Sequence, residues 1–253
     1  METLFSLTQL TLPQFLIVGG VIFAAGVVRG FSGFALSALV MASLVTIYPP
    51  IELIAVCWFL EMSASLLMVR SGFQNWDGKM VTGLVIGSAI GSPIGLYLTN
   101  TLPVETSKFI ALCIVLLLAV LQLLKVRAAF LATTPGIYVS GLTAGVATGL
   151  ASVGGMVIAL YVLAREAAAS TMRGSLVMFL FLASLTSFIY LYWFGMMDVR
   201  AVSRGLIFAP ACLIGVLVGQ ALFRPRLEPY YKPFCLGLLM ALAAFGLARM
   251  SVG

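Results

Sequence analysis

The sequence predicts an all-α protein that crosses a membrane many times and is built from two homologous halves. Hydrophobic residues make up 62% of its 253 residues and charged residues only 9%, whereas soluble domains carry about 25% charged residues. The mean hydropathy is +1.16, and apolar runs extend along the whole chain, which leaves no room for a sizeable soluble domain. The net charge of +6 is typical of the positive-inside bias of membrane proteins. No basic cluster is dense enough to indicate nucleic-acid binding.

Six segments have the length and apolar character of membrane-spanning helices, which need about 20 residues. They are Ile51–Val69, Met80–Leu98, Thr106–Leu124, Met172–Phe194, Ala201–Phe223 and Tyr231–Ala248. Glycine, proline, asparagine and aspartate residues between these segments mark turns. Residues 1–12 contain Glu2 and no basic residue, which is unlike a signal peptide, so we expect the first hydrophobic segment to remain in the protein.

Two further hydrophobic regions are interrupted by glycine. Thr11–Tyr48 is too long for one helix and is broken at Gly30–Gly33, and Pro135–Ala164 is broken at Ser152–Gly155. Glycine costs a helix about 1 kcal/mol relative to alanine, and a lipid-facing backbone must satisfy its own hydrogen bonds. We therefore expect each break to line a cavity enclosed by protein. Each region is either one broken span or a hairpin of two shorter helices.

The second half of the chain repeats the first, with small insertions. The matched positions are Gly26/Gly145, Gly30/Gly149, Asp77/Asp198, Gly91/Gly215, Gly95/Gly219 and Lys108/Lys232. We expect repeats at residues 1–127 and 128–253, each opening with a Gly-rich broken helix or hairpin that three spanning helices follow. Internal duplication of this kind is characteristic of secondary transporters.

The basic residues favour the hairpin alternative. If each Gly-rich region crosses the membrane once, the basic residues divide evenly between the two sides. If each is a hairpin, most of them share one side, and only Lys108, Arg200, Arg204 and Arg249 lie opposite. Because Lys and Arg accumulate on the cytoplasmic side, we prefer the hairpins, which make the halves inverted repeats and place both termini outside the cytoplasm.

The Gly-rich breaks are the predicted substrate site. Successive backbone N–H groups at a broken helix form an anion-binding concavity, and small residues let a ligand approach the backbone. The predicted binding residues are Arg29, Gly30, Ser32, Gly33, Ser152, Gly154 and Gly155. Arg29 supplies positive charge in the first half only, which predicts asymmetric binding. The alternative is that the glycines only let helices pack closely, and we prefer that interpretation for Gly87–Gly95 and for Gly215 and Gly219.

Glu61 is the predicted proton-coupling residue. It lies near the middle of a predicted span, where a charged side chain costs about 2.5–3.5 kcal/mol. We expect it to pair with Arg29 and to titrate during transport; the alternative is a purely structural ion pair. Glu52, Thr171 and Arg173 stand close to the starts of predicted helices and are secondary candidates for the site.

The sequence argues against enzymatic chemistry. Gly30-Phe31-Ser32-Gly33 matches the GxSG motif of rhomboid intramembrane proteases, but the chain has no histidine to activate Ser32. The lysines stand at the ends of the predicted segments, and no nucleotide-binding motif occurs. The four cysteines are singly placed, so we predict no metal site and no cofactor.

The two Gly-rich motifs resemble those of a known family. Gly30-Phe31-Ser32-Gly33-Phe34-Ala35-Leu36 is similar to the first motif of the sulfite exporter TauE/SafE family, also called the toluene-sulfonate uptake permeases, and Gly149–Gly155 is similar to the second. The resemblance covers nearly the whole chain. Ala35 stands where the family commonly has glycine, and a proline often found beyond each motif is missing.

The resemblance implies a secondary transporter of the bacterial cytoplasmic membrane that moves sulfite, sulfonates, sulfoacetate or related anions. We expect export, driven either by coupling to protons through Glu61 or by the membrane potential. The expected partners are the small anion, protons and the lipid bilayer, and a homodimer is one option for the oligomeric state. An anion channel of the same architecture and an uptake permease for an organic acid are the alternatives.

Overall fold

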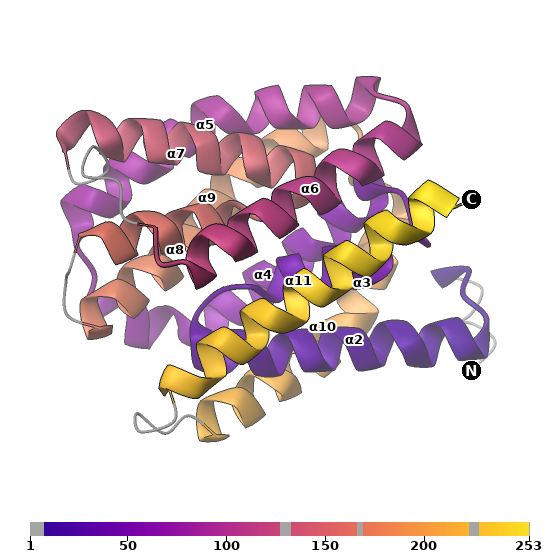
Figure 1. Ribbon diagram of the computed structural model, residues 1–253, viewed down its shortest axis with the longest axis horizontal. Coiled ribbons are helices and arrows are strands. Elements are labelled where there is room, and N and C mark those ends of the chain that lie inside the picture. Colours follow the sequence, from indigo (N-terminus) through magenta and orange to yellow (C-terminus); the bar gives the residue numbers. More distant parts are fainter. Residues whose placement is uncertain (1–7, 127–132, 166–168, 223–227, 253) are drawn as a thin grey trace.

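The computed structural model of the protein is a bundle of helices (Figure 1). It describes residues 8–126, 133–165, 169–222 and 228–252. Within these ranges the helices are α2 (Leu12–Ser32), α3 (Leu36–Leu44), α4 (Pro50–Phe73), α5 (Gly78–Thr101), α6 (Val104–Leu123), α7 (Thr134–Ala151), α8 (Gly154–Ala164), α9 (Ala169–Trp193), α10 (Val199–Leu222) and α11 (Glu228–Val252). No strand occurs in these ranges. The predicted all-α fold is confirmed.

Seven of these helices are long and apolar enough to cross a membrane, namely α2, α4, α5, α6, α9, α10 and α11. All six spans predicted from the sequence are among them, with ends that differ by a few residues. The additional span is α2, which is the first part of the first Gly-rich region. The predicted boundary between the repeats, at residues 127 and 128, lies outside the described residues.

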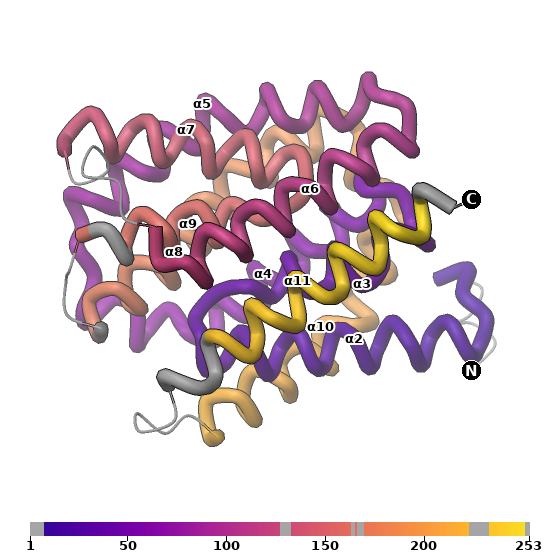
Figure 2. The backbone as a smooth tube through the Cα atoms, viewed as in Figure 1, coloured from indigo at the N-terminus to yellow at the C-terminus, as the bar shows by residue number. Residues whose placement is uncertain are grey.

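Each Gly-rich region consists of a long helix and a short helix that runs back along it (Figure 2). In the first half, the contacts of Arg204, on α10, show that the short helix returns to the start of the long one. Nε of Arg204 lies 2.9 Å from the carbonyl oxygen of Thr8, and its guanidinium lies 5.4 Å from the centre of the Tyr48 ring. Thr8 precedes α2 and Tyr48 follows α3, so both ends of the region lie together. In the second half, α7 and α8 form the corresponding turn.

Left-handed backbone conformations make the two turns. Gly33 ends α2 with φ +80°, and Ala35 precedes α3 with φ +73°. Ser152, with φ +57°, stands between α7 and α8. Glycine adopts this conformation without the clash that a Cβ causes, which explains why a glycine suits the position of Ala35.

Each half packs one of its helices against the Gly-rich region of the other half. α10 lies along α2, and α5 lies along α7. A Cβ on Gly26 would lie 3.3 Å from Gly215 Cα, and a Cβ on Gly30 would lie 2.9 Å from Gly219 Cα. Because residue numbers rise together in these contacts, α2 and α10 run parallel. Small residues allow this close approach of two backbones.

The pair α5 and α7 has the same construction. Its close contacts join Gly87, Gly91 and Gly95 on α5 to the backbone of α7 between Tyr138 and Gly149. These helices are also parallel. The packing role predicted for Gly87–Gly95, Gly215 and Gly219 is confirmed.

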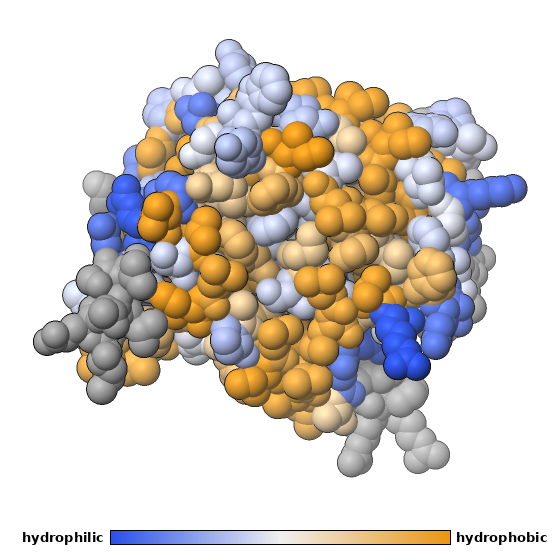
Figure 3. All heavy atoms as spheres, turned by 180° about the vertical axis from the view of Figure 1, so that it is seen from behind, coloured by the Kyte–Doolittle hydropathy of each residue, from blue (hydrophilic) through white to orange (hydrophobic). Residues whose placement is uncertain are grey.

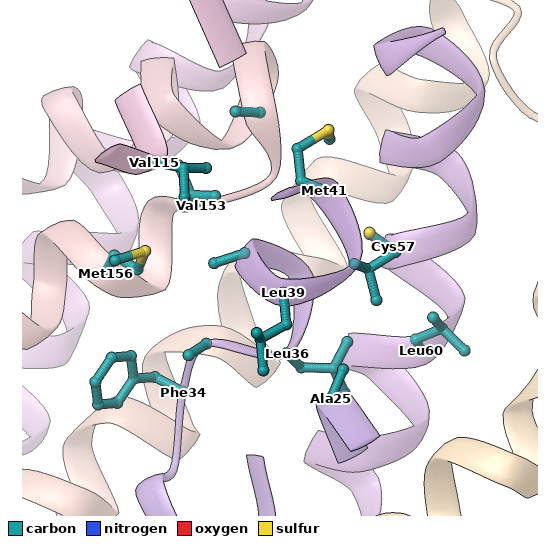
Figure 4. Packing of buried hydrophobic residues seen from close by; sticks show 14 of the residues in the cluster. Ala25, Phe34, Leu36, Leu39, Met41, Cys57, Leu60, Val115, Val153 and Met156 are labelled. Atoms are coloured by element: carbon teal, nitrogen blue, oxygen red, sulfur yellow. The ribbon is translucent and has the colours of Figure 1, made fainter. Parts of the chain in front are cut away.

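The short helices α3 and α8 lie inside the bundle. Eight of the ten residues labelled in Figure 4 belong to these helices, to the turns before them, or to α4. In α3 the residues from Leu36 to Ala42 are all buried. A helix that is apolar on every side is expected in a protein interior, and the short helices therefore carry the two turns deep into the bundle.

Basic residues gather at the two ends of the bundle. We call one the Glu52 end, where α2, α4 and α10 begin and α5, α9 and α11 end, and the opposite one the Asn75 end. The helix termini put Arg70, Lys79, Lys125, Arg165 and Arg173 toward the Asn75 end, and Lys108, Arg200, Arg204 and Arg249 toward the Glu52 end. Figure 3 shows hydrophobic residues between two more hydrophilic ends. This distribution of the described basic residues between the two ends is the one expected if each Gly-rich region is a hairpin.

Candidate functional site

A cleft lies beside the turn between α7 and α8. Its volume is about 550 Å³, including its open mouth. Residues of α4, α5, α7, α8 and α9 line it, and the turn between α7 and α8 contributes Ser152. They are Ile54, Trp58, Glu61, Ser92, Leu96, Thr148, Gly149, Ser152, Gly154, Gly155, Phe179, Leu180, Ala183, Ser184, Ser187 and Leu191. The cleft therefore combines Glu61 of the first half with the Gly-rich turn of the second.

Glu61 connects this cleft with the interior of the first half. Its side chain projects from α4 and the residue is 8% exposed. Oε1 accepts hydrogen bonds from the backbone N of Ser37, at 3.3 Å, and from Ser37 Oγ, at 2.8 Å. Oε2 lies 3.4 Å from Nε of Arg29. The predicted pairing of Arg29 with Glu61 is confirmed.

Arg29 lies behind Glu61 and is not among the residues that line the cleft. The residue is fully buried at the end of α2. Nη2 donates to Ser65 Oγ at 3.0 Å, and Nη1 donates to the carbonyl oxygen of Gly33. The positive charge is therefore held by the turn of its own half and is neutralised by Glu61. Any effect of Arg29 on a ligand in the cleft passes through the electrostatics of this pair.

The other predicted residues of the first turn make contacts within the protein. Ser32 Oγ accepts from the backbone N of Phe34, at 3.2 Å, and lies 2.7 Å from the carbonyl oxygen of Val28. Gly33 provides the left-handed end of α2. Gly30 packs on α10, and its carbonyl oxygen accepts a hydrogen bond of 2.7 Å from Arg173 Nη2. The structure brings these residues around Arg29 rather than into the cleft.

The predicted residues of the second turn do line the cleft. Ser152, Gly154 and Gly155 lie there together with Glu61. Gly154 is the first residue of α8, so its N–H and that of Gly155 have no acceptor within the helix. A Cβ on Gly155 would lie 3.1 Å from Cδ2 of Leu180, so a larger residue there would narrow the site.

Several hydroxyl groups of the cleft were missed by sequence reasoning. Ser184 and Ser187 share a face of α9, where their spacing of three residues was a usable signal. Ser92 stands between Gly91 and Gly95 in a stretch that predicts packing alone. Ser92 is 1% exposed, and its Oγ has no hydrogen-bond partner among the described residues.

The secondary candidates lie outside this cleft. Glu52 Oε2 accepts from Arg204 Nη1 at the Glu52 end, beside a smaller, mostly apolar cleft between α2, α3, α4 and α10, and the N–O distance is 2.6 Å. Tyr48 lines the same smaller cleft. Burial raises the pKa of its phenol above the usual value, and the Arg204 guanidinium offsets only part of this rise. Thr171 is half-buried in the first turn of α9, near Arg173.

Among the described residues, no group of three or more His, Cys, Asp or Glu side chains could hold a metal ion. The four cysteines are free thiols. The polar chemistry of the cleft is thus that of hydroxyls, backbone N–H groups and one carboxylate.

Comparison with known proteins gives one match. A family model described as Sulfite exporter TauE/SafE matches residues 18–246, which is most of the chain and includes both Gly-rich turns. Neither the search of curated proteins nor the search of solved structures found a match.

Proposed function

Because the chain belongs to the sulfite exporter TauE/SafE family of membrane transporters, we propose that it moves a small sulfur-containing anion across the bacterial cytoplasmic membrane together with a proton. Sulfite, sulfonates and sulfoacetate are the proposed class, and export is the proposed direction. One observation carries the proposal, namely that Glu61 lines the cleft on one side and is paired with buried Arg29 on the other.

The ion pair gives a physical reason for coupling. With Glu61 ionised, the pair has no net charge. If Glu61 takes up a proton, Arg29 keeps a buried positive charge without a partner, and an uncompensated buried charge costs about 3–5 kcal/mol. An anion in the cleft would restore the balance, because Coulomb interactions are strong where water is excluded. Proton and anion would therefore bind together more readily than either alone.

The proposed site has unequal contributions from the two halves. The second half supplies Ser152, Gly154 and Gly155, which line the cleft. The first half supplies the positive charge of Arg29. The roles proposed for Gly30, Ser32 and Gly33 are indirect, since their backbone and side-chain contacts shape the turn that holds Arg29.

We propose that the halves act as inverted repeats that expose the cleft alternately to the two sides. The helix directions support opposite orientations of the two Gly-rich regions, since α2 begins at the Glu52 end whereas α7 begins at the Asn75 end. The lining residues Ile54 and Leu191 lie toward the Glu52 end. At the Asn75 end, α4 and α9 touch, since a Cβ on Gly174 would lie 2.9 Å from the carbonyl oxygen of Gly72.

The test is transport by the purified protein in liposomes. We expect saturable movement of sulfite or sulfoacetate, accumulation driven by a pH gradient, and counterflow of labelled against unlabelled anion. The matched comparison is Glu61→Gln, which should abolish the response to the pH gradient. A flux that does not saturate and shows no counterflow would identify an anion channel instead, and no flux of any sulfur anion would overturn the proposed substrate class.

A further inference from the structure

The first half contains an internal example of an anion bound at a broken helix. The carboxylate of Glu61 lies at the N-terminus of α3, where its Oε1 accepts from both the backbone N and the Oγ of Ser37. Ser37 is the second residue of α3. The N-terminal turn of a helix has unpaired N–H groups and a partial positive charge, so a carboxylate is a suitable partner there.

The corresponding helix of the second half has no such carboxylate. Glu61 projects from α4 and Leu180 from α9, which are the long helices that follow the Gly-rich turn in the first and in the second half. Glu61 faces the second residue of α3, and Leu180 lies against Gly155, the second residue of α8. Leu180 thus occupies the place of Glu61 in the repeat, and its apolar side chain cannot accept a hydrogen bond from α8.

A second observation indicates that a ligand belongs at this helix terminus. Ser92, from α5, lines the same cleft as Gly154 and Gly155, and it is 1% exposed. Its Oγ has no partner among the described residues. Leaving a buried hydroxyl unpaired is costly. Among the described serines whose Oγ has no partner, Ser92 is the one that lines this cleft, where a bound molecule can supply the partner.

We propose that the N–H groups of Gly154 and Gly155 together with Ser92 Oγ bind the oxyanion group of the substrate, in the way that α3 and Ser37 bind the carboxylate of Glu61. This inference rests on the proposed function and adds the ligand contacts to it. Ser92 plays the part that Ser37 plays in the first half. One half of the duplicated site is filled by the chain's own carboxylate, and the other half takes the carboxylate, sulfonate or sulfite group of the transported anion.

The test measures binding of methanesulfonate to the full-length protein in detergent by titration calorimetry at neutral pH. Ser92→Ala should raise Kd roughly 10-fold or more, because a hydrogen bond to a charged group is lost. Ser140→Ala is the matched control. Ser140 is also a buried serine on a long helix whose Oγ has no partner among the described residues, but it is not among the cleft residues, so its Kd should equal that of the wild type.

A second variant places an internal anion in the cleft. Leu180→Glu should put a carboxylate at the start of α8 and abolish methanesulfonate binding, and Leu180→Gln should bind more tightly than Leu180→Glu because it lacks the charge. Thermal unfolding checks that both variants fold. If Leu180→Glu does not fold, the comparison of Ser92→Ala with Ser140→Ala decides alone.

The outcomes separate this inference from the proposed function. The wild-type protein could bind and transport the anion while Ser92→Ala leaves Kd unchanged. This result would overturn the proposed binding at Gly154, Gly155 and Ser92 and would leave the proposed function standing. A wild-type protein that binds neither methanesulfonate nor sulfite nor sulfoacetate would overturn the proposed function itself. Weakened binding in Ser92→Ala, with Ser140→Ala unchanged, supports the site.

Discussion

Arg29 on α2 and Glu61 on α4 face each other inside the bundle, with 3.4 Å between Nε and Oε2. The Arg29 side chain is fully buried and the Glu61 side chain is 11% exposed. Two opposite charges in such a place depend on each other, since either one alone would be buried without compensation. The proposed coupling of anion and proton follows from this dependence.

Glu61→Gln removes one member of the pair. We expect it to lower the free energy of unfolding by about 3–5 kcal/mol, because Arg29 is left as an unpaired buried charge. The double variant Arg29→Gln/Glu61→Gln should regain part of this loss, and thermal unfolding in detergent measures both. Equal stability of Glu61→Gln and the wild type would contradict the role of the pair.

Glu52→Gln is the matched comparison for Glu61→Gln. Glu52 pairs with Arg204 at the Glu52 end, where its side chain is 39% exposed, and partly exposed ion pairs contribute about 0–1 kcal/mol. We expect a small loss of stability and unchanged dependence of transport on pH. A loss of pH dependence in Glu52→Gln would move the proton site to the smaller cleft.

Gly30→Ala tests whether Gly30 packs helices or binds substrate. A Cβ at this position would overlap the backbone of α10, and such overpacking costs about 1–3 kcal/mol. Gly20 lies on the same helix with nothing within 4 Å of an added Cβ, so Gly20→Ala should gain about 0.5–1 kcal/mol. Thermal unfolding of the two variants should therefore shift in opposite directions. A Gly30→Ala protein of wild-type stability that no longer binds the anion would show that Gly30 contacts substrate.

Ala35→Gly should stabilise the protein. Ala35 has φ +73°, a conformation that costs a non-glycine residue about 1–2 kcal/mol, while glycine loses about 0.5–1 kcal/mol more backbone entropy on folding. The expected gain is up to about 1.5 kcal/mol in the free energy of unfolding. Ala38→Gly, inside α3, is the control and should destabilise. A loss of stability in Ala35→Gly would indicate that the turn before α3 differs from the one described.

Reporter insertions distinguish hairpins from single crossings. Leu102 follows α5 and Gly195 follows α9, and both lie at the Glu52 end, whereas Asn75 lies at the opposite end. We expect reporters at 102 and 195 to report one side of the membrane and a reporter at 75 to report the other. If each Gly-rich region crossed once, positions 102 and 195 would lie on opposite sides. Which of the two sides is the cytoplasm is read from the same experiment.

Much of the fold was predictable because it depends on local properties of the sequence. Uninterrupted apolar segments gave the six spans, and the glycines of the two interrupted regions gave the turns at Gly33 and Ser152. The pairing of α2 with α10 and of α5 with α7 was not predicted. Glycine spacing shows that a helix has a face for close packing, but it does not identify the helix that covers this face.

The candidate site was predicted in part for a similar reason. Glu61, Ser152, Gly154 and Gly155 were named from charge and composition, and the structure places them in one cleft. Ser92 was missed, because Ser88 and Ser92 follow Gly87 and Gly91 at a spacing of four residues, and this pattern of small residues predicts helix packing. The position of Arg29 behind Glu61 depends on how α2, α3 and α4 pack, and no sequence spacing reports that.

The pairing of α2 with α10 has a consequence for the synthesis of the protein. α2 is made long before α10, and Gly26 and Gly30 of α2 are covered by the backbone of α10 only after α10 has entered the membrane. During this interval the insertion machinery or lipid must cover these glycines. Chains truncated before α10 should therefore be short-lived in cells, even when their first half is intact.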